Sequence, residues 1–205
     1  MIAIIDYGAG NLKSVKNALD YMNVDSVITD KTEDIIKSDR VILPGDGSFG
    51  YMMENLEKKR LVNPIKNFIK SGKPFLGICL GLQGLFEESE ESPNVKGLSI
   101  FKGKVVKFRK GKVPQIGWNK IISKKKGIFK NDCMYFVNSY YVVPKDNSII
   151  ATTTDYNGNF VSAIKADNIT AMQFHPEKSG RDGIMLISKW LNNQKNPRKK
   201  FNRKD

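Results

Sequence analysis

Residues 75–82 read Phe75-Leu76-Gly77-Ile78-Cys79-Leu80-Gly81-Leu82, an apolar run that ends in a cysteine placed between two glycines. The first half of this stretch is short and apolar, which is typical of a buried strand. The residues that follow, 80–88, are compatible with a helix, so Cys79 is expected on the turn between a strand and a helix. Flanking glycines permit a sharp turn that exposes the middle side chain, and the start of a helix favours a thiolate. The pattern G-x-C-x-G in this context predicts that Cys79 is a nucleophile.

Strands alternate with helices on the N-terminal side of this turn. Residues 2–6 form a short apolar run, and residues 12–22 carry apolar side chains at helical spacing. A second apolar run lies at 41–43, and a helical pattern over 61–72 ends at a glycine. Strands that alternate with helices imply βα units and a parallel sheet that is covered on both faces.

The sequence becomes rich in β-strand residues after Pro93. Asn157-Gly158 lies between two of these stretches and is a strong hairpin signal, because both residues tolerate positive φ. A final helix carries Ile184, Ile187 and Leu191 on one face. We therefore expect antiparallel additions to a mainly parallel α/β sheet, formed by the stretches 98–108, 116–122, 134–143, 148–154, 160–165 and 169–174.

Length and composition indicate one compact domain. The chain has 205 residues, of which 40% are hydrophobic, and no segment has the composition of a linker. We expect one domain over 1–192 and a basic, disordered tail over 193–205. The tail has six basic residues and one aspartate, so it supplies +5 of the net charge of +13. No nucleic-acid-binding motif accompanies this charge, so we expect a solvated tail and no nucleic-acid or membrane contact.

Other classes of protein are disfavoured by what the sequence lacks. No apolar run is long enough to span a bilayer, and no basic segment precedes the first strand, so neither a membrane span nor a signal peptide is expected. Two cysteines, Cys79 and Cys133, cannot build a disulfide framework, and a reducing cytoplasm suits them. Cys133 lies in a β-rich run and is expected to fill the core.

Neither a metal nor a nucleotide cofactor is expected. One histidine and two distant cysteines cannot complete a zinc site. Gly8-Ala9-Gly10 begins like a dinucleotide-binding loop, but Lys13 stands where the third glycine of that fingerprint belongs.

The single histidine, His175, is the candidate base for the thiol of Cys79. It lies in Gln173-Phe174-His175-Pro176-Glu177, at the end of an apolar stretch. Pro176 biases His175 towards extended backbone, in which residues i and i+2 project to the same side. Glu177 can therefore bind one ring nitrogen and leave the other to take the thiol proton. The expected triad is Cys79, His175 and Glu177.

These residues resemble the signature of class I glutamine amidotransferases, a G-x-C-x-G turn followed later by H-P-E. The chain is similar in particular to the glutaminase subunits of imidazole glycerol phosphate synthase, in order and up to about residue 192. The segments that carry this resemblance are 5–12, 43–50, 77–83, 117–119, 139–141 and 173–180. It implies a single-domain, flavodoxin-like α/β fold, in which a mixed, mainly parallel sheet is flanked by helices.

The resemblance also implies a reaction and a role for each matching position. Cys79 would form a thioester with the side chain of L-glutamine, and ammonia would leave for a synthase partner after protonation by His175. The implied oxyanion site consists of the N–H of Leu80 and one N–H from Gly45, Asp46 or Gly47. The implied glutamine contacts are Gln83, Ser139 and Tyr140, and the implied partner contacts are Trp118, Asn119 and Lys178. Core packing is the alternative for Trp118 and Tyr140.

Three positions depart from the pattern expected of these subunits. Gln115 and Asn138 each stand where histidine is common, and Asp46 stands where a small apolar residue is usual. None belongs to the triad, so the departures concern the partner and the acceptor of the ammonia. A related glutaminase that serves amidotransferases of bacterial surface sugars remains an alternative. A non-catalytic regulatory subunit and a cysteine hydrolase of another amide are further alternatives.

Overall fold

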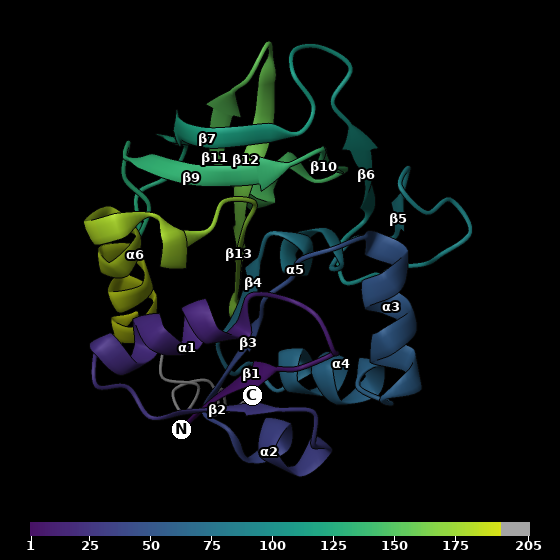
Figure 1. The fold of residues 1–205 in the computed structure, drawn as a ribbon, viewed down its shortest axis with the longest axis vertical. Helices are drawn as coiled ribbons and strands as arrows, with labels where there is room; N and C mark the ends of the chain where they lie inside the picture. The colour runs from purple at the N-terminus through teal and green to yellow at the C-terminus, as the bar shows by residue number, and fades with distance from the viewer. Residues whose placement is uncertain (194–205) are drawn as a thin grey trace, which may run out of the picture.

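The computed structural model of the protein describes residues 1–193 and consists of a large mixed sheet flanked by helices, with a small sheet at one end (Figure 1). Five neighbouring strands of the large sheet run parallel, and in spatial order they are β2 (Ser26–Thr29), β1 (Ile2–Ile5), β3 (Arg40–Leu43), β4 (Phe75–Ile78) and β13 (Ile169–Met172). Parallel neighbours need crossover connections, which the helices supply. The predicted mainly parallel sheet is confirmed.

Antiparallel strands continue the sheet beyond β13. They are β12 (Asn159–Ala166), β10 (Tyr140–Pro144) and β6 (Gly103–Lys107), while β11 (Ile150–Asp155) pairs with β12 and with β8 (Ile122–Ser123). The short edge strand β5 (Glu88–Ser89) pairs with β6 in parallel. The predicted hairpin connects β11 and β12 through residues 156–158, where Asn157 and Gly158 have φ of +55° and +134°. The expected antiparallel additions are therefore present.

Helices cover both faces of the parallel strands (Figure 1). One face is covered by α1 (Leu12–Tyr21) and α6 (Gly180–Asn192), and the other by α2 (Thr32–Lys37), α3 (Phe49–Lys58) and α4 (Val62–Lys70). Ile2 and Ile4 of β1 belong to the hydrophobic core under α1 and α6, whereas Ala3 and Ile5 belong to the core under α2, α3 and α4. Alternate residues of a strand face opposite sides, so a strand buried on both faces is apolar throughout.

The apolar face predicted for the last helix is turned slightly from its expected position. Leu186, Ile187 and Trp190 are its most deeply buried large side chains, while Ile184 and Leu191 pack half-buried against the same core. Each helix within residues 1–193 is too short or too polar to span a lipid bilayer. The predicted basic tail over 193–205 lies outside the described residues, apart from Asn193.

A two-stranded antiparallel ribbon lies next to the large sheet and consists of β7 (Gln115–Lys120) and β9 (Cys133–Asn138) (Figure 1). Met134 and Phe136 of β9 face the core. Cys133, which we expected in the core, is exposed, so that prediction was wrong. The reason is the alternation of the strand: when Met134 faces inward, its neighbour must face outward.

Candidate active site

Cys79 lies on a sharp turn between β4 and α5 (Leu80–Gln83). Its φ is +55°, and holding a residue with a side chain in this region costs about 1–3 kcal/mol. The N–H of Cys79 donates to the carbonyl oxygen of Met172 at 2.7 Å, which fixes the turn to β13. Cys79 therefore lies at the carboxyl ends of the parallel strands, where sheets of this type bind ligands.

The helix after Cys79 is shorter than the predicted stretch 80–88. It ends at Gln83, because the chain turns at Gly84 towards β5, and the N–H of Leu98 donates to the carbonyl oxygen of Gly84 at 2.7 Å. A single turn of helix carries a small dipole, so the helix contributes less to a thiolate at Cys79 than its predicted length implied.

Glycines allow the loop after β3 to pack directly on this turn. A Cβ atom at Gly81 would lie 1.9 Å from the carbonyl oxygen of Leu43, and one at Gly45 would lie 2.5 Å from the Cβ of Leu80. Both distances are far below van der Waals contact, so only glycine fits. The structure thus places Gly45 beside Leu80, as the predicted oxyanion site requires.

Asp46 and Gly47 continue the same loop. The N–H of Asp46 donates to the hydroxyl of Tyr7 at 3.2 Å, and that hydroxyl lies 3.1 Å from the carbonyl oxygen of Asp46, to which it can donate. Burial holds the pKa of Tyr7 well above its usual value, so its hydroxyl is neutral. The N–H of Asp46 is therefore already engaged, which leaves Gly45 and Gly47 as the loop donors for an oxyanion.

His175 and Glu177 form a buried pair. Nδ1 of His175 lies 2.8 Å from Oε1 of Glu177, and their side chains are 3% and 1% exposed. Burial lowers the pKa of His175, but the thiolate of Cys79 and the carboxylate of Glu177 outweigh burial and raise this pKa to about 10. Nε2 makes no hydrogen bond to any described residue. Cys79 and Glu177 both raise the pKa of His175, so together they favour the protonated imidazole.

Buried amides extend from the sulfur of Cys79. Nε2 of Gln173 donates to Sγ at 3.5 Å, and Nε2 of Gln83 donates to Oε1 of Gln173 at 3.0 Å. Gln83 also donates to the carbonyl oxygen of Tyr140 at 3.1 Å. Two predicted glutamine contacts, Gln83 and Tyr140, are thus brought close to the nucleophile. Gln173 was quoted in the histidine motif but was given no role from the sequence.

Ser139 lies half-buried just before Tyr140, beside two of the departing positions. Gln115 and Asn138 face each other across β7 and β9, and both are at least 95% buried. Nδ2 of Asn138 donates to the carbonyl oxygen of Tyr140 at 3.0 Å. Oε1 of Gln115 and Oδ1 of Asn138 have no partner among the described residues. These two departures therefore lie at the inner face of the ribbon, next to the amide network.

Strand β9 contacts both members of the predicted catalytic pair. The N–H of His175 donates to the carbonyl oxygen of Tyr135 at 2.9 Å. The thiol of Cys79 lies 3.8 Å from the carbonyl oxygen of Val137, two residues further along the strand. Carbonyl groups two residues apart point the same way from a strand, so one edge of β9 contacts both the backbone of His175 and the sulfur of Cys79.

The predicted partner residues are divided between the two faces of the ribbon. Trp118 and Ile116 are 59% and 61% exposed, and the ring of Trp118 packs edge-on against Tyr135 at 6.1 Å. Half-buried Lys178 follows the H-P-E segment, two residues before Gly180, and a Cβ atom at Gly180 would lie 4.0 Å from the ring of Trp118. The side chain of Asn119 points to the opposite face and donates to the carbonyl oxygen of Asp155 at 2.9 Å.

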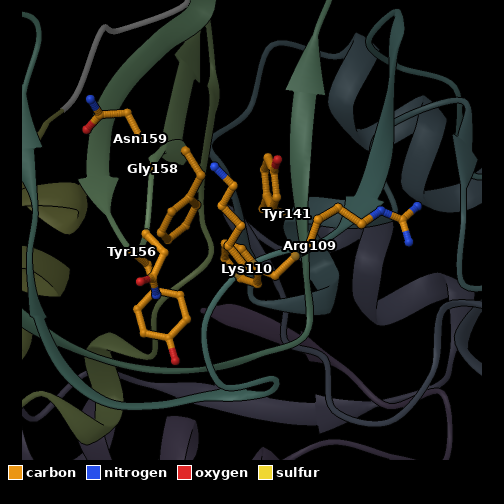
Figure 2. Close-up of a pocket in the computed structure, with 9 residues that line it drawn as sticks. Arg109, Lys110, Tyr141, Tyr156, Gly158 and Asn159 are labelled. Atoms are coloured by element: carbon orange, nitrogen blue, oxygen red, sulfur yellow. The ribbon is translucent and has the colours of Figure 1, made fainter.

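A separate pocket of about 220 Å³ lies between the end of β6, strand β10 and the β11–β12 hairpin (Figure 2). Its aromatic lining comes from Phe108, Tyr141, Tyr156 and Phe160. The guanidinium group of Arg109 extends away from the other labelled side chains (Figure 2) and pairs with Glu90 at 2.8 Å. None of the predicted catalytic or glutamine-binding residues lines this pocket.

Comparison with known proteins gives one consistent result. The family model described as "Glutamine amidotransferase class-I" matches residues 3–192. The chain is 50% identical over 196 residues to "Imidazole glycerol phosphate synthase subunit HisH" of Pyrococcus furiosus. This match covers 91% of this chain and 95% of that protein. It is 48% identical over 191 residues to the protein of the same name from Aquifex aeolicus, which covers 90% and 92% of the two chains.

Solved structures agree on the fold. A structure described as "Crystal structure of glutamine amidotransferase" superimposes with a TM-score of 0.77 at 15% identity, covering 94% of this chain and 98% of the other. The structure of PurLQS from Thermotoga maritima has a TM-score of 0.72 at 20% identity, covering 93% and 97%. At such identities the likeness concerns the fold alone.

Proposed function

The chain belongs to the class I glutamine amidotransferase family, and from that membership we propose that it is the glutaminase subunit of an imidazole glycerol phosphate synthase. It hydrolyses L-glutamine to glutamate and ammonia, and a synthase partner consumes the ammonia in histidine biosynthesis. The relatives named above support this pathway over the surface-sugar alternative, because they match nearly the whole chain at 48–50% identity.

The proposed reaction begins with the thiolate of Cys79, which attacks the side-chain carbonyl carbon of glutamine. The oxyanion accepts hydrogen bonds from the N–H of Leu80 and from an N–H of Gly45 or Gly47. Nε2–H of His175 gives its proton to the leaving nitrogen, so ammonia departs and a thioester remains. His175 then takes a proton from water, whose oxygen attacks the thioester and releases glutamate. The thiolate is regenerated, and Glu177 holds the imidazole in place throughout.

One observation carries this proposal above the others. The side chain of the only histidine in the chain is 3% exposed, pairs with Glu177 at 2.8 Å, and lies beside the strained cysteine turn. A buried imidazole between a carboxylate and a thiol is costly to maintain without a use for it. The intact triad also argues against a non-catalytic regulatory subunit.

The partner is proposed to dock on the outer face of the β7–β9 ribbon. Exposed Trp118 and Ile116 give this face large apolar side chains, and aromatic residues are enriched in protein interfaces. Lys178 would add a positive charge, because it lies two residues before Gly180, where an added Cβ would lie 4.0 Å from the ring of Trp118. Asn119 is the weakest of the predicted interface residues, because its amide is bonded to the neighbouring hairpin. A cytoplasmic location is proposed from the chemistry, since the nucleophile must stay a reduced thiol.

Replacement of the nucleophile tests the proposal. In the complex with the synthase partner, Cys79→Ala should abolish glutamate release from glutamine but leave the reaction of the partner with added ammonium salt intact. Cys133→Ala is the matched control, because it removes the exposed thiol and should retain both activities. Glutaminase activity in the Cys79→Ala complex would refute the assignment of the nucleophile. A purified wild-type complex without glutaminase activity would refute the function itself.

A further inference from the structure

Ser179 stands at the N-terminal cap of α6 but does not cap that helix. A cap serine ordinarily accepts a hydrogen bond from an N–H two or three residues ahead, which stabilises a helix by about 1 kcal/mol. Here the side chain makes no such bond, although the residue is only 2% exposed. Its hydroxyl is therefore committed to other groups.

Those groups are the backbones of His175 and of strand β9. The hydroxyl of Ser179 donates to the carbonyl oxygen of His175 at 2.6 Å and accepts from the N–H of Tyr135 at 2.9 Å. The N–H of His175 in turn donates to the carbonyl oxygen of Tyr135 at 2.9 Å. Three hydrogen bonds thus form a closed ring that links His175, Tyr135 and Ser179. Every donor in the ring has an acceptor, so moving any of the three residues breaks a hydrogen bond that is buried or partly buried.

The segment that carries Ser179 is held tightly on its other side as well. A Cβ atom at Gly183 would lie 1.9 Å from the carbonyl oxygen of Pro176 and 2.8 Å from the Cβ of Ser179. The first turn of α6 therefore packs directly on the H-P-E segment. The backbone around His175 is therefore packed between α6 and β9, and the hydroxyl of Ser179 is hydrogen-bonded to both His175 and β9.

We infer that Ser179 is a positioning residue for the reaction, which holds His175 against strand β9 so that the imidazole keeps its place between Glu177 and Cys79. The inference rests on the proposed function of Cys79 and His175 in glutamine hydrolysis. The position of Ser179 also links the predicted catalytic pair to the proposed docking face. The same strand touches Cys79 through Val137 and carries Tyr135 beside Trp118, so the catalytic pair and the proposed docking face share one rigid strand.

The test compares three variants in the complex with the synthase partner. Ser179→Ala removes the hydroxyl, and Ser179→Thr retains one. Ser38→Ala is the matched control, because Ser38 is also fully buried and its hydroxyl donates to a backbone carbonyl, that of Ile35, at 2.8 Å at the end of α2. For each variant, kcat and KM for glutamine are measured per folded molecule across the pH range. The NMR titration of the imidazole is recorded on each variant of the untagged chain, where His175 is the only histidine.

Ser179→Ala should lower kcat by about 10- to 100-fold with little change in KM, because a misplacement of about 1 Å can cost this much. The imidazole should titrate at lower pH, since His175 moves away from the two groups that raise its pKa. Ser179→Thr should restore most of the wild-type kcat, and Ser38→Ala should lose stability without either change. Wild-type kcat and titration in Ser179→Ala would overturn the inference. A wild-type complex that releases no glutamate would instead overturn the proposed function, and the titration alone would then decide the role of Ser179.

Discussion

Glu177→Gln is the sharpest probe of the buried pair that organises this site. The substitution keeps the size of the side chain and its carbonyl oxygen but removes the charge 2.8 Å from Nδ1 of His175. An opposite charge at this distance moves a pKa by about 1–3, and the pKa of His175 stands at about 10 with the charge in place. The alkaline limit of kcat, where the imidazolium proton needed by the leaving nitrogen is lost, should therefore move to lower pH by about 1–3 pH units.

The size of the loss in rate follows from the same contact. A hydrogen bond to a charged group contributes about 1.5–3 kcal/mol, so kcat at neutral pH should fall by about 10- to 100-fold. The assay is glutamate release by the complex from neutral to strongly alkaline pH, together with the NMR titration of the single histidine. Glu87→Gln is the control, because the carboxylate of Glu87 accepts from the N–H of Gly103 at 2.9 Å and does not contact His175. An alkaline limit that stays in place, or that rises, would mean that the charge of Glu177 does not raise the pKa of His175.

The raised pKa of His175 also predicts how the free energy of unfolding depends on pH, which urea unfolding at several pH values measures. A histidine whose pKa is raised by the fold stabilises the protein fully below its unfolded value of about 6.5, and this contribution is lost as the pH rises towards about 10. In Glu177→Gln the contribution should be smaller and should disappear at lower pH.

Three further predictions concern the turn, the amide network and the ribbon. Gly81→Ala should destabilise the fold by about 3 kcal/mol or more in urea unfolding, because its Cβ would lie 1.9 Å from the carbonyl oxygen of Leu43. Gly158 has φ of +134°, but an added Cβ there would meet no atom within 4 Å, so Gly158→Ala should cost about 1 kcal/mol through backbone strain alone. Equal losses of stability in the two variants would contradict the clash proposed at Gly81. Gln173→Leu removes the donor to Sγ and should slow alkylation of Cys79 by iodoacetamide about 10-fold or more, whereas an unchanged rate would mean that the 3.5 Å contact does not stabilise the thiolate. Trp118→Ala should weaken binding of the synthase partner by about 2 kcal/mol in calorimetry, while Tyr51→Ala, 47% exposed on α3, should not, and equal affinities would remove the ribbon as the docking face.

Features that depend on neighbouring residues were predicted correctly. Apolar strands such as 75–78 are apolar at every position because both faces are buried, and this is visible without knowing what covers them. The sharp turn predicted at Cys79 is present, with φ of +55°, and His175 and Glu177 pair as predicted. The backbone between them differs from the prediction: His175 is extended, as a residue before proline should be, but the chain then enters the 3₁₀ helix η2 (Pro176–Lys178), and this turn brings Glu177 to the imidazole.

Features that depend on register were predicted less well. The exposure of Cys133 is decided by which face of β9 meets the core, and a shift of one residue would have buried it. The length of α5 is decided by where the chain must turn to reach β5, which the apolar pattern does not contain.

Three features follow from the amino-acid sequence alone, because each arises from backbone preferences and spacing within a few residues: the alternation of strands and helices, the cysteine turn, and the closeness of Glu177 to His175. The packing of distant strands and helices brings His175 near Cys79 and selects the residues that support the predicted triad. Gln173 reaches Cys79 across 94 residues of chain, and Ser179 reaches Tyr135 across 44. A buried hydroxyl or amide takes whichever partner the packed strands bring to it, so Ser179, which its position in the sequence would assign to its own helix, is bonded to the backbone of His175 and to strand β9.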